Sequence, residues 1–214
     1  MKNYLTITIL FVLPQMIGGQ CNVRPDLAGE NIPGSKEVCT DPISVYEDST
    51  RIPLRKFVFD QMADLDEKTV VDIGAGPGFF AFEMAKKAKR VIATELDDLF
   101  LRYMTQKCQE GNIYNFEVRK ANDKHSELYG LRADYALMVY VFHYLRDPKS
   151  FLTRLKSALV PGGKLFVVNA QLSPVIIKDY LVGAGFTDLS EISFTYKTQN
   201  CGPQEVQMII GCVP

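Results

Sequence analysis

The sequence predicts an α/β fold in which a mostly parallel sheet of seven strands carries helices on both faces and ends in an antiparallel hairpin. From Thr69 onward, short stretches rich in Val and Ile alternate with stretches whose apolar residues recur at helical spacing, which is typical of parallel sheets. The end of the chain breaks this alternation. Two strand-like stretches there are separated by "NCGP", which is a turn sequence, so they are expected to pair as a hairpin.

The elements are expected in a regular order. A helix within "PLRKFVFDQMADL", residues 53–65, precedes the sheet, because its apolar residues recur at mostly helical spacing. The expected strands are residues 69–73, 90–95, 114–119, 133–139, 164–169, 189–199 and 204–213. The expected helices within the sheet region are residues 79–88, 98–108, 150–159 and 174–184. For the helix at 150–159, Ser150 is a candidate N-cap and Gly162 is expected to stop it.

The N-terminal part differs from the rest of this chain of 214 residues. Residues 1–20 contain Lys2 followed by an uncharged, mostly apolar stretch with small residues near its end, which is the pattern of a cleaved secretory signal. An uncleaved membrane anchor is the alternative, although the apolar centre is short against the ~20 residues of a membrane span. Residues 21–50, rich in Pro, Gly, Asn and Asp, are expected to form an irregular arm before a single domain at 51–214. We therefore expect an exported protein, periplasmic or secreted, or one anchored through its N-terminus.

The amino-acid composition indicates which classes of binding partner to expect. Lys and Arg total 24 against 25 acidic residues, and no long basic run occurs, which argues against a nucleic-acid partner and favours a small molecule. No metal is expected, because the chain has no CxxC pair and only 2 histidines. The 5 cysteines include Cys21 and Cys39 in the arm and Cys201 and Cys212 around the hairpin, so an exported chain could oxidise two pairs and leave Cys108.

A glycine-rich loop follows the first strand in "VVDIGAGPGFF", residues 70–80. Such a loop lets a ligand approach the backbone closely. It is not a P-loop, because aromatic residues stand where Lys and Ser or Thr would follow the glycines. It also departs from the dinucleotide fingerprint G-x-G-x-x-G, whose third glycine would fall at Phe79. Because Glu95 ends the second strand and could hold a ribose, the pattern favours a ligand that has a ribose but no pyrophosphate.

Four stretches in register resemble the class I S-adenosylmethionine-dependent methyltransferases, and the likeness runs from about Phe57 to the C-terminus. They are "VVDIGAGPGFF", "VIATELDD", "VRKANDKHSEL" and "ADYALMVYVFHYLRDPKSFLTRLKSALVPGGKLFVV". The resemblance implies a Rossmann-like methyltransferase fold that binds S-adenosylmethionine, releases S-adenosylhomocysteine and methylates a small acceptor. The leader and "VYEDSTR", residues 45–51, further resemble a group of exported bacterial methyltransferases of the type 11-like kind. In that group an aromatic-plus-acidic pair follows the arginine, whereas "IPLRKF" stands here.

The resemblance also implies roles for individual residues. Asp72 would help position the methionine part of the cofactor, and Glu95 would bind both ribose hydroxyls, with Leu96 beside the adenine. Asn122 or Asp123 would meet the adenine amino group. The other expected cofactor contacts are Gly74, Ala75, Gly76, Gly78 and Tyr140.

Methyl transfer is a direct displacement at a carbon activated by a sulfonium, so holding the two reactants in line supplies much of the rate. A base is needed only if the acceptor keeps its proton until it attacks. His143 is the candidate, since imidazole titrates near neutral pH, and the alternative is a structural histidine at the turn after the fourth strand.

Two other classes of protein stay open. The chain could be a catalytically silent protein that binds S-adenosylmethionine or a nucleoside, or an exported interaction protein with the same fold. A dehydrogenase is the third choice, which the glycine spacing and the terminal hairpin disfavour. The acceptor is not identified by any motif in the sequence.

Overall fold

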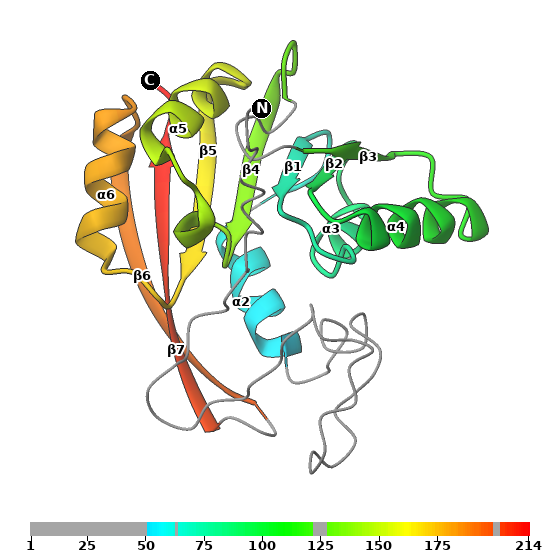
Figure 1. The fold of residues 1–214 in the computed structure, drawn as a ribbon, viewed down its shortest axis with the longest axis horizontal. Coiled ribbons are helices and arrows are strands. Elements are labelled where there is room, and N and C mark those ends of the chain that lie inside the picture. The colour runs from blue at the N-terminus through cyan, green and yellow to red at the C-terminus, as the bar shows by residue number, and fades with distance from the viewer. Residues whose placement is uncertain (1–50, 63, 122–127, 199–201) are drawn as a thin grey trace, which may run out of the picture.

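The structure is a computed structural model, and it describes residues 51–62, 64–121, 128–198 and 202–214. The predicted signal at 1–20 and the predicted arm at 21–50 lie outside these ranges. The first elements are α2 (Ile52–Met62), β1 (Thr69–Ile73), α3 (Ala81–Met84), β2 (Arg90–Glu95), α4 (Asp98–Glu110) and β3 (Phe116–Lys120). The remaining elements are β4 (Ala133–Val139), the 3-10 helix η3 (Phe142–Tyr144), α5 (Pro148–Ser157), β5 (Leu159–Asn169), α6 (Pro174–Gly183), β6 (Thr187–Thr198) and β7 (Gly202–Cys212) (Figure 1).

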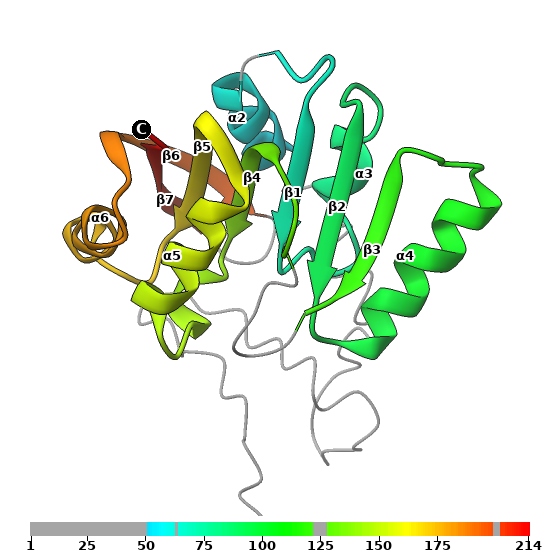
Figure 2. The same cartoon turned by 90° about the horizontal axis from the view of Figure 1, so that it is seen from above.

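One sheet of seven strands has the order β3-β2-β1-β4-β5-β7-β6, and only β7 runs antiparallel to its neighbours. Figure 2 shows the five parallel strands side by side. After β1 the chain builds outward through β2 and β3, and it then returns to place β4 on the other side of β1. The carboxyl ends of β1 and β4 therefore lie at a topological switch point, where open α/β sheets bind their ligands. The predicted fold class is confirmed.

Helices cover both faces of this sheet because the side chains of successive strand residues point to opposite faces. Val71 and Ile73 of β1 belong to a core cluster with α5 and α6, whereas Val70 belongs to a cluster with α2, α3 and α4. Each fully buried Leu, Ile, Phe or Met in these clusters contributes roughly 1.5–3 kcal/mol. The two cores fix β1 and β4 firmly and thereby fix the loops that follow them.

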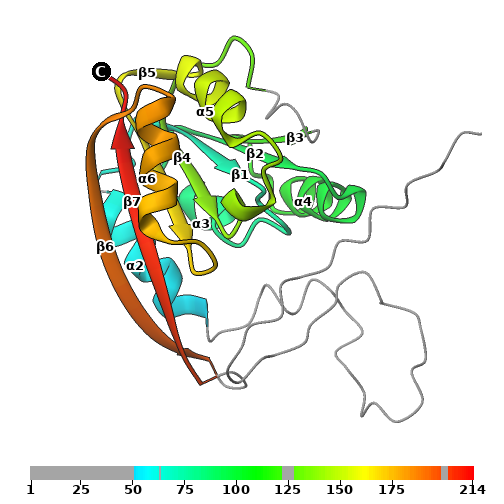
Figure 3. The same ribbon diagram turned by 60° about the vertical axis from the view of Figure 1, so that its left-hand side comes forward.

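The β6–β7 hairpin is longer than the sheet it closes. β7 pairs with β5 only as far as Asn169↔Gln207, but its pairing with β6 continues to Thr198↔Gly202. The part of the hairpin that does not pair with β5, which we call the overhang, thus extends past the carboxyl ends of the parallel strands, as Figure 3 shows. There Phe194 of β6 stacks on Phe57 of α2, with ring centroids 4.4 Å apart. The overhang and α2 together form a wall beside the switch point.

The structure describes one member of the two predicted cysteine pairs. Cys212 is the last residue of β7 and carries a free thiol. Its expected partner Cys201 lies outside the described residues, as do Cys21 and Cys39. Both predicted pairings therefore stay predictions.

Several predicted boundaries differ from the structure. The helix expected at 79–88 is reduced to the single turn of α3, because the glycine loop and the turns around it occupy the flanking residues. The helix expected at 150–159 begins two residues earlier, since Asp147 caps it by accepting from the Ser150 N–H at 3.1 Å. It ends at Ser157 without help from Gly162, which lies within β5. These shifts leave the carboxyl edge of the sheet unchanged.

Candidate functional site

The glycine loop turns sharply at the end of β1. Gly74, Gly76 and Gly78 all have positive φ, at 67°, 57° and 90°, which is the left-handed region that favours glycine. The N–H groups of Gly74 and Ala75 both donate to the Thr94 carbonyl, at 2.9 and 3.0 Å, so the loop is tied to β2. A Cβ atom on Gly74 would lie 2.5 Å from Cγ2 of Val141. The glycines therefore let the loop pack closely between β2 and the segment after β4.

Asp72 lies beneath this loop and is 2% exposed. Its Oδ2 atom is buried and has no hydrogen-bond partner among the residues that the structure describes. Burial, followed by repulsion from Glu95, raises the pKa of Asp72 from 3.8 to about 7, although the Ala81 N–H donates to this carboxyl and opposes the shift. A buried carboxyl oxygen without a partner costs free energy, so it needs an explanation. A positively charged ligand group would supply one.

Glu95 ends β2 beside the same loop. Its Oε2 accepts from the Gly76 N–H at 2.7 Å, and its Oε1 accepts from the N–H groups of Leu96 at 2.6 Å and Asp97 at 3.1 Å. These bonds hold the carboxylate against the glycine loop. A carboxylate offers about four acceptor positions, of which three are used here. One acceptor position of Glu95 is therefore left unused by the described residues.

The residues expected around the adenine are only partly described. Leu96 is 48% exposed, so its side chain leaves an apolar surface on which a flat ring can pack. Asn122 and Asp123, the candidates for the adenine amino group, lie outside the described residues. Leu96 thus adds an apolar surface beside Glu95 at the end of β2.

Tyr140 follows β4 in a strained conformation. Its φ is 59°, a value that bulky residues other than glycine rarely adopt. Its hydroxyl lies 3.1 Å from the hydroxyl of Tyr196, which reaches it from β6. Burial, with a smaller contribution from Tyr196, raises the pKa of the Tyr140 hydroxyl above its usual range, so the hydroxyl stays protonated. Backbone strain of this kind gathers at functional sites, which fits the expected position of Tyr140 beside the cofactor.

His143 lies in η3, directly after Tyr140 and Val141, and it is partly buried. Its Nδ1 lies 3.2 Å from the side-chain amide of Asn169, the last residue of β5. Its Nε2 is buried and has no partner among the described residues, as is also true of the Asp72 Oδ2 atom. Burial lowers the pKa of His143, so the ring is neutral at neutral pH. Asn169 lies in no recognisable sequence motif, and only its position at the end of a strand could have marked it as a site residue.

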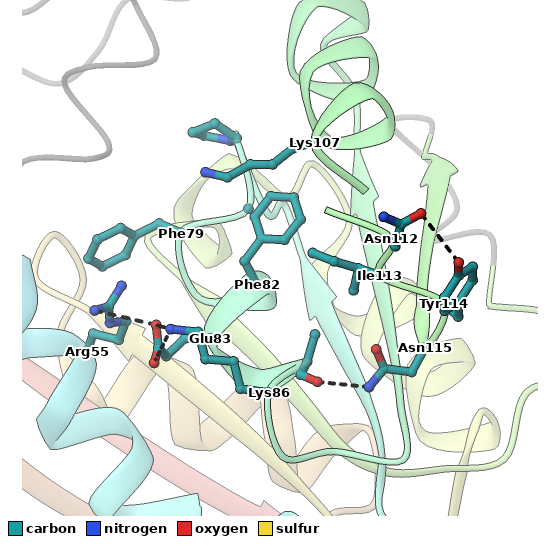
Figure 4. Close-up of a pocket in the computed structure, with 13 residues that line it drawn as sticks. Arg55, Phe79, Phe82, Glu83, Lys86, Lys107, Asn112, Ile113, Tyr114 and Asn115 are labelled. Atoms are coloured by element: carbon teal, nitrogen blue, oxygen red, sulfur yellow. Dashed lines mark hydrogen bonds and ion pairs between the residues drawn. The ribbon is translucent and has the colours of Figure 1, made fainter. Parts of the chain in front are cut away.

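A separate cavity of about 900 Å³ lies along the outer side of α3 (Figure 4). It is lined by Gly78 and Phe79 of the glycine loop, by Phe82, by Lys107 of α4 and by the residues before β3, but not by Asp72, Glu95 or Tyr140. Its cations already have partners, since Arg55 lies 3.6 Å from Glu83 and Lys107 lies 4.9 Å from the centre of the Phe82 ring. The cavity extends toward the amino end of β3, whereas ligands of such sheets bind at the carboxyl ends. We therefore place the candidate site at the strand ends.

The structure gathers most of the predicted residues at one edge of the sheet. Asp72 and Glu95 lie at the ends of the paired strands β1 and β2, and Tyr140 and His143 follow β4, which pairs with β1 on its other side. Over the described part of the chain, no group of three or more potential metal ligands occurs. Over the same part, no helix is long and apolar enough to cross a membrane. The chemistry available at this edge is that of carboxylates, a neutral imidazole and backbone N–H groups.

The sequence matches known methyltransferases over much of its length. A family described as "Methyltransferase domain" matches residues 71–165. Ubiquinone biosynthesis O-methyltransferase of Acinetobacter baumannii (strain AYE) is 26% identical over 137 residues, which make up 63% of this chain and 57% of that protein. An uncharacterized methyltransferase of Mycobacterium tuberculosis (strain ATCC 25618 / H37Rv) is 28% identical over 114 residues, or 52% of this chain and 55% of that one. The chain thus spans somewhat more than half the length of these curated relatives.

Solved structures show the same fold. A SAM-dependent methyltransferase from Aquifex aeolicus is similar with a TM-score of 0.62 and 21% identity, over 81% of this chain and 99% of that one. Haemonchus contortus phosphoethanolamine N-methyltransferase 2, solved with phosphomonomethylethanolamine and S-adenosylhomocysteine, is similar with a TM-score of 0.62 and 14% identity, over 76% of this chain and 53% of that one. At these identities the likeness is one of fold.

Proposed function

We propose that the chain is a class I S-adenosylmethionine-dependent methyltransferase and that it transfers a methyl group from S-adenosylmethionine to a small-molecule acceptor. The proposed cofactor site is the edge formed by the glycine loop, Asp72, Glu95 and Leu96, with Tyr140 closing it from β4. The proposed acceptor site adjoins it at η3. S-Adenosylmethionine, when bound, supplies a methyl group on a sulfonium sulfur.

The observation that carries this proposal is the unpartnered Oδ2 atom of Asp72 beneath a loop that also presents Glu95. S-Adenosylmethionine has a positive end, made of its ammonium and sulfonium groups, and a ribose with two hydroxyls. Asp72 in its ionised form suits the positive end, and the free acceptor position of Glu95 suits a ribose hydroxyl. The two carboxylates, Asp72 and Glu95, therefore fit the two ends of this one ligand.

A dinucleotide fits the same loop less well. Phe79 occupies the place of the third glycine of the dinucleotide fingerprint, and its ring packs at 5.2 Å from the ring of Phe80, between centroids. Asp72 would also place a buried acidic group near the phosphates, which repel it. These two features favour a sulfonium nucleoside over a pyrophosphate.

Calorimetric titration tests the cofactor. We expect S-adenosylmethionine and S-adenosylhomocysteine to bind the wild-type chain and NAD not to bind. Binding of NAD alone would replace the proposal with a dehydrogenase. Binding of none of the three would favour a protein that kept the fold without the cofactor, and binding without turnover on any acceptor would favour a silent binding protein.

We further propose that residues 1–20 direct export, on the strength of the apolar stretch behind Lys2. S-Adenosylmethionine is made in the cytosol, so an exported enzyme would need a supply of cofactor outside it. N-terminal sequencing of the mature protein tests this point. A mature chain that begins after residue 20 supports a cleaved signal, and one that retains the stretch supports an anchor.

A further inference from the structure

The hydrogen bonds around Asn169 fix the direction in which its side-chain amide faces. Three backbone N–H groups, those of Ala170, Gln171 and Leu172, converge on one end of this amide at 3.2, 2.9 and 2.7 Å. An N–H group only donates, so that end must be the carbonyl oxygen. Asn169 is fully buried, and turning its NH₂ end toward these donors instead would take the acceptor away from the N–H groups of Gln171 and Leu172.

The NH₂ end of Asn169 then faces the imidazole. It donates to Nδ1 of His143 at 3.2 Å and to the side-chain oxygen of Gln171 at 3.1 Å. A ring nitrogen that accepts a hydrogen bond carries no proton, and a neutral imidazole has one proton in all. In the neutral ring that proton therefore resides on Nε2.

The Nε2–H group of His143 is buried and has no partner among the described residues. A buried N–H left unpaired is costly, so its environment favours a ligand that brings an acceptor atom. Protonating the ring would also place a second proton on Nδ1, directly against the NH₂ of Asn169. Burial lowers the pKa of His143. With its NH₂ end toward Nδ1, Asn169 cannot accept a hydrogen bond from a protonated Nδ1, so this orientation of the amide also opposes protonation of the ring.

We propose that Asn169 is a positioning residue that holds His143 as the Nε2–H form, so that His143 donates a hydrogen bond to the methyl acceptor and does not remove its proton. The role of His143 toward an acceptor rests on the proposed function, whereas the position of the proton does not. The Nε2–H group orients the bound acceptor. The attacking atom of the acceptor has already given its proton to water when the acceptor binds.

The transfer step is balanced without a proton on the ring. A lone pair of the acceptor forms the bond to the methyl carbon. The bond from that carbon to sulfur breaks, and its electron pair stays on sulfur, which turns the sulfonium into the neutral thioether of S-adenosylhomocysteine. An acceptor that carries one negative charge becomes neutral in the same step, so no base is required at His143.

Nitrogen-15 NMR of the histidine rings tests the proposal directly in the ligand-free wild-type protein. The chain has 2 histidines, His125 and His143, and the His143→Gln variant identifies which signals belong to His143. At a pH where the ring is neutral, we expect Nε2 of His143 to show the signal of a protonated nitrogen and Nδ1 that of an unprotonated one. The reverse assignment overturns the proposal, whether or not the protein binds S-adenosylmethionine.

The Asn169→Asp variant supplies the matched comparison. An aspartate keeps an oxygen for the three backbone donors, but its other oxygen accepts from Nδ1–H instead of donating. We expect the proton of His143 to move to Nδ1 and the pKa of the ring to rise, because a negative charge now lies beside it. An unchanged proton position in a folded Asn169→Asp variant contradicts the role assigned to Asn169. If this variant does not fold, the wild-type spectrum alone decides.

Discussion

The two halves of the candidate site are built in different ways. The cofactor half is defined as the glycine loop with Asp72 and Glu95, and its residues come from β1, β2 and the segments that directly follow them. Glu95 accepts hydrogen bonds from an N–H group of the loop and from the N–H groups that follow its own strand. The acceptor half, defined as Tyr140 and His143 with their partners, depends on distant segments. Tyr196 of β6 reaches Tyr140, and Asn169 of β5 reaches His143.

The two halves are stabilised by different parts of the chain. In the cofactor half, backbone geometry does most of the work, since three glycines with positive φ bring N–H groups to a carboxylate. In the acceptor half, the side chains of Tyr140 and His143 are held by other side chains, and one of these, Tyr196, comes from the long hairpin. Yet each half contains one buried polar atom without a partner in the described residues, Oδ2 of Asp72 and Nε2 of His143. We propose that the cofactor is the partner of Oδ2 and that the methyl acceptor is the partner of Nε2.

Removing the charge of Asp72 should have the largest effect. The pKa of Asp72 in the folded chain, about 7, lies above its ordinary value of 3.8. Its contribution to the free energy of unfolding is therefore fully present below the ordinary value and is lost as pH rises through about 7. Without ligand, the Asp72→Asn variant should be more stable than the wild type above that pH, by about 2–4 kcal/mol.

Denaturant unfolding at several pH values measures this difference. It should shrink toward zero as pH falls to the ordinary range of a carboxyl group. Asp60→Asn is the control, since Asp60 is exposed and pairs with Lys56 on the surface of α2. If the difference in free energy of unfolding between the wild type and Asp72→Asn does not vary with pH, the pKa of Asp72 is not raised, and the cofactor half has no buried carboxylate that waits for a ligand.

Glu95→Gln should come next and should affect the cofactor half alone. The amide keeps the size of the side chain but turns one oxygen into a donor that faces N–H donors, and it loses the charged acceptor for the ribose. Losing hydrogen bonds to a charged group should weaken S-adenosylhomocysteine binding by about 1.5–3 kcal/mol, or roughly 10- to 100-fold. Calorimetric titration measures the affinity, with Glu110→Gln on α4 as the control. Unchanged affinity in Glu95→Gln would remove Glu95 from the site.

Tyr196→Phe should have the smallest effect and should report on the acceptor half. The substitution leaves the buried hydroxyl of Tyr140 without its partner at 3.1 Å, which should lower the free energy of unfolding by about 1 kcal/mol. The double variant Tyr140→Phe with Tyr196→Phe should regain part of that loss, because it removes both partners. Denaturant unfolding checks both values. Strictly additive effects of the two substitutions would mean that the hairpin does not support Tyr140.

The same contrast explains what the sequence could predict. The strands at 69–73, 90–95 and 133–139 were expected with the bounds that the structure has, because short apolar stretches between turn residues mark buried strands clearly. The glycines and the acids at the strand ends lie in continuous motifs, so the cofactor half could be proposed from sequence. Asn169 and Tyr196 lie in no such motif. Their contacts with His143 and Tyr140 depend on the order of strands in the sheet and on the length of the hairpin.

Two helix boundaries were predicted wrongly. Periodicity extended the first helix of the sheet region over residues 79–88, but the residues beside the glycine loop form turns, and only α3 is helical. Gly162 was expected to stop the helix at 150–159, whereas it lies in an irregular part of β5 where the register with β4 shifts. Local turns decided the first case, and strand pairing decided the second.

The most direct test of the account is the affinity for S-adenosylmethionine as a function of pH in the wild type and in Asp72→Asn. If the ionised carboxylate meets the positive end of the cofactor, wild-type affinity should rise with pH up to about 7, by at most about tenfold per pH unit, and then level off. The Asp72→Asn variant should bind S-adenosylmethionine more weakly above that pH and should lack this rise in affinity. Because the variant has no carboxyl at position 72, it also controls for titration of the ligand. Equal affinity and equal pH dependence in both proteins would contradict the assignment of Asp72 to the cofactor.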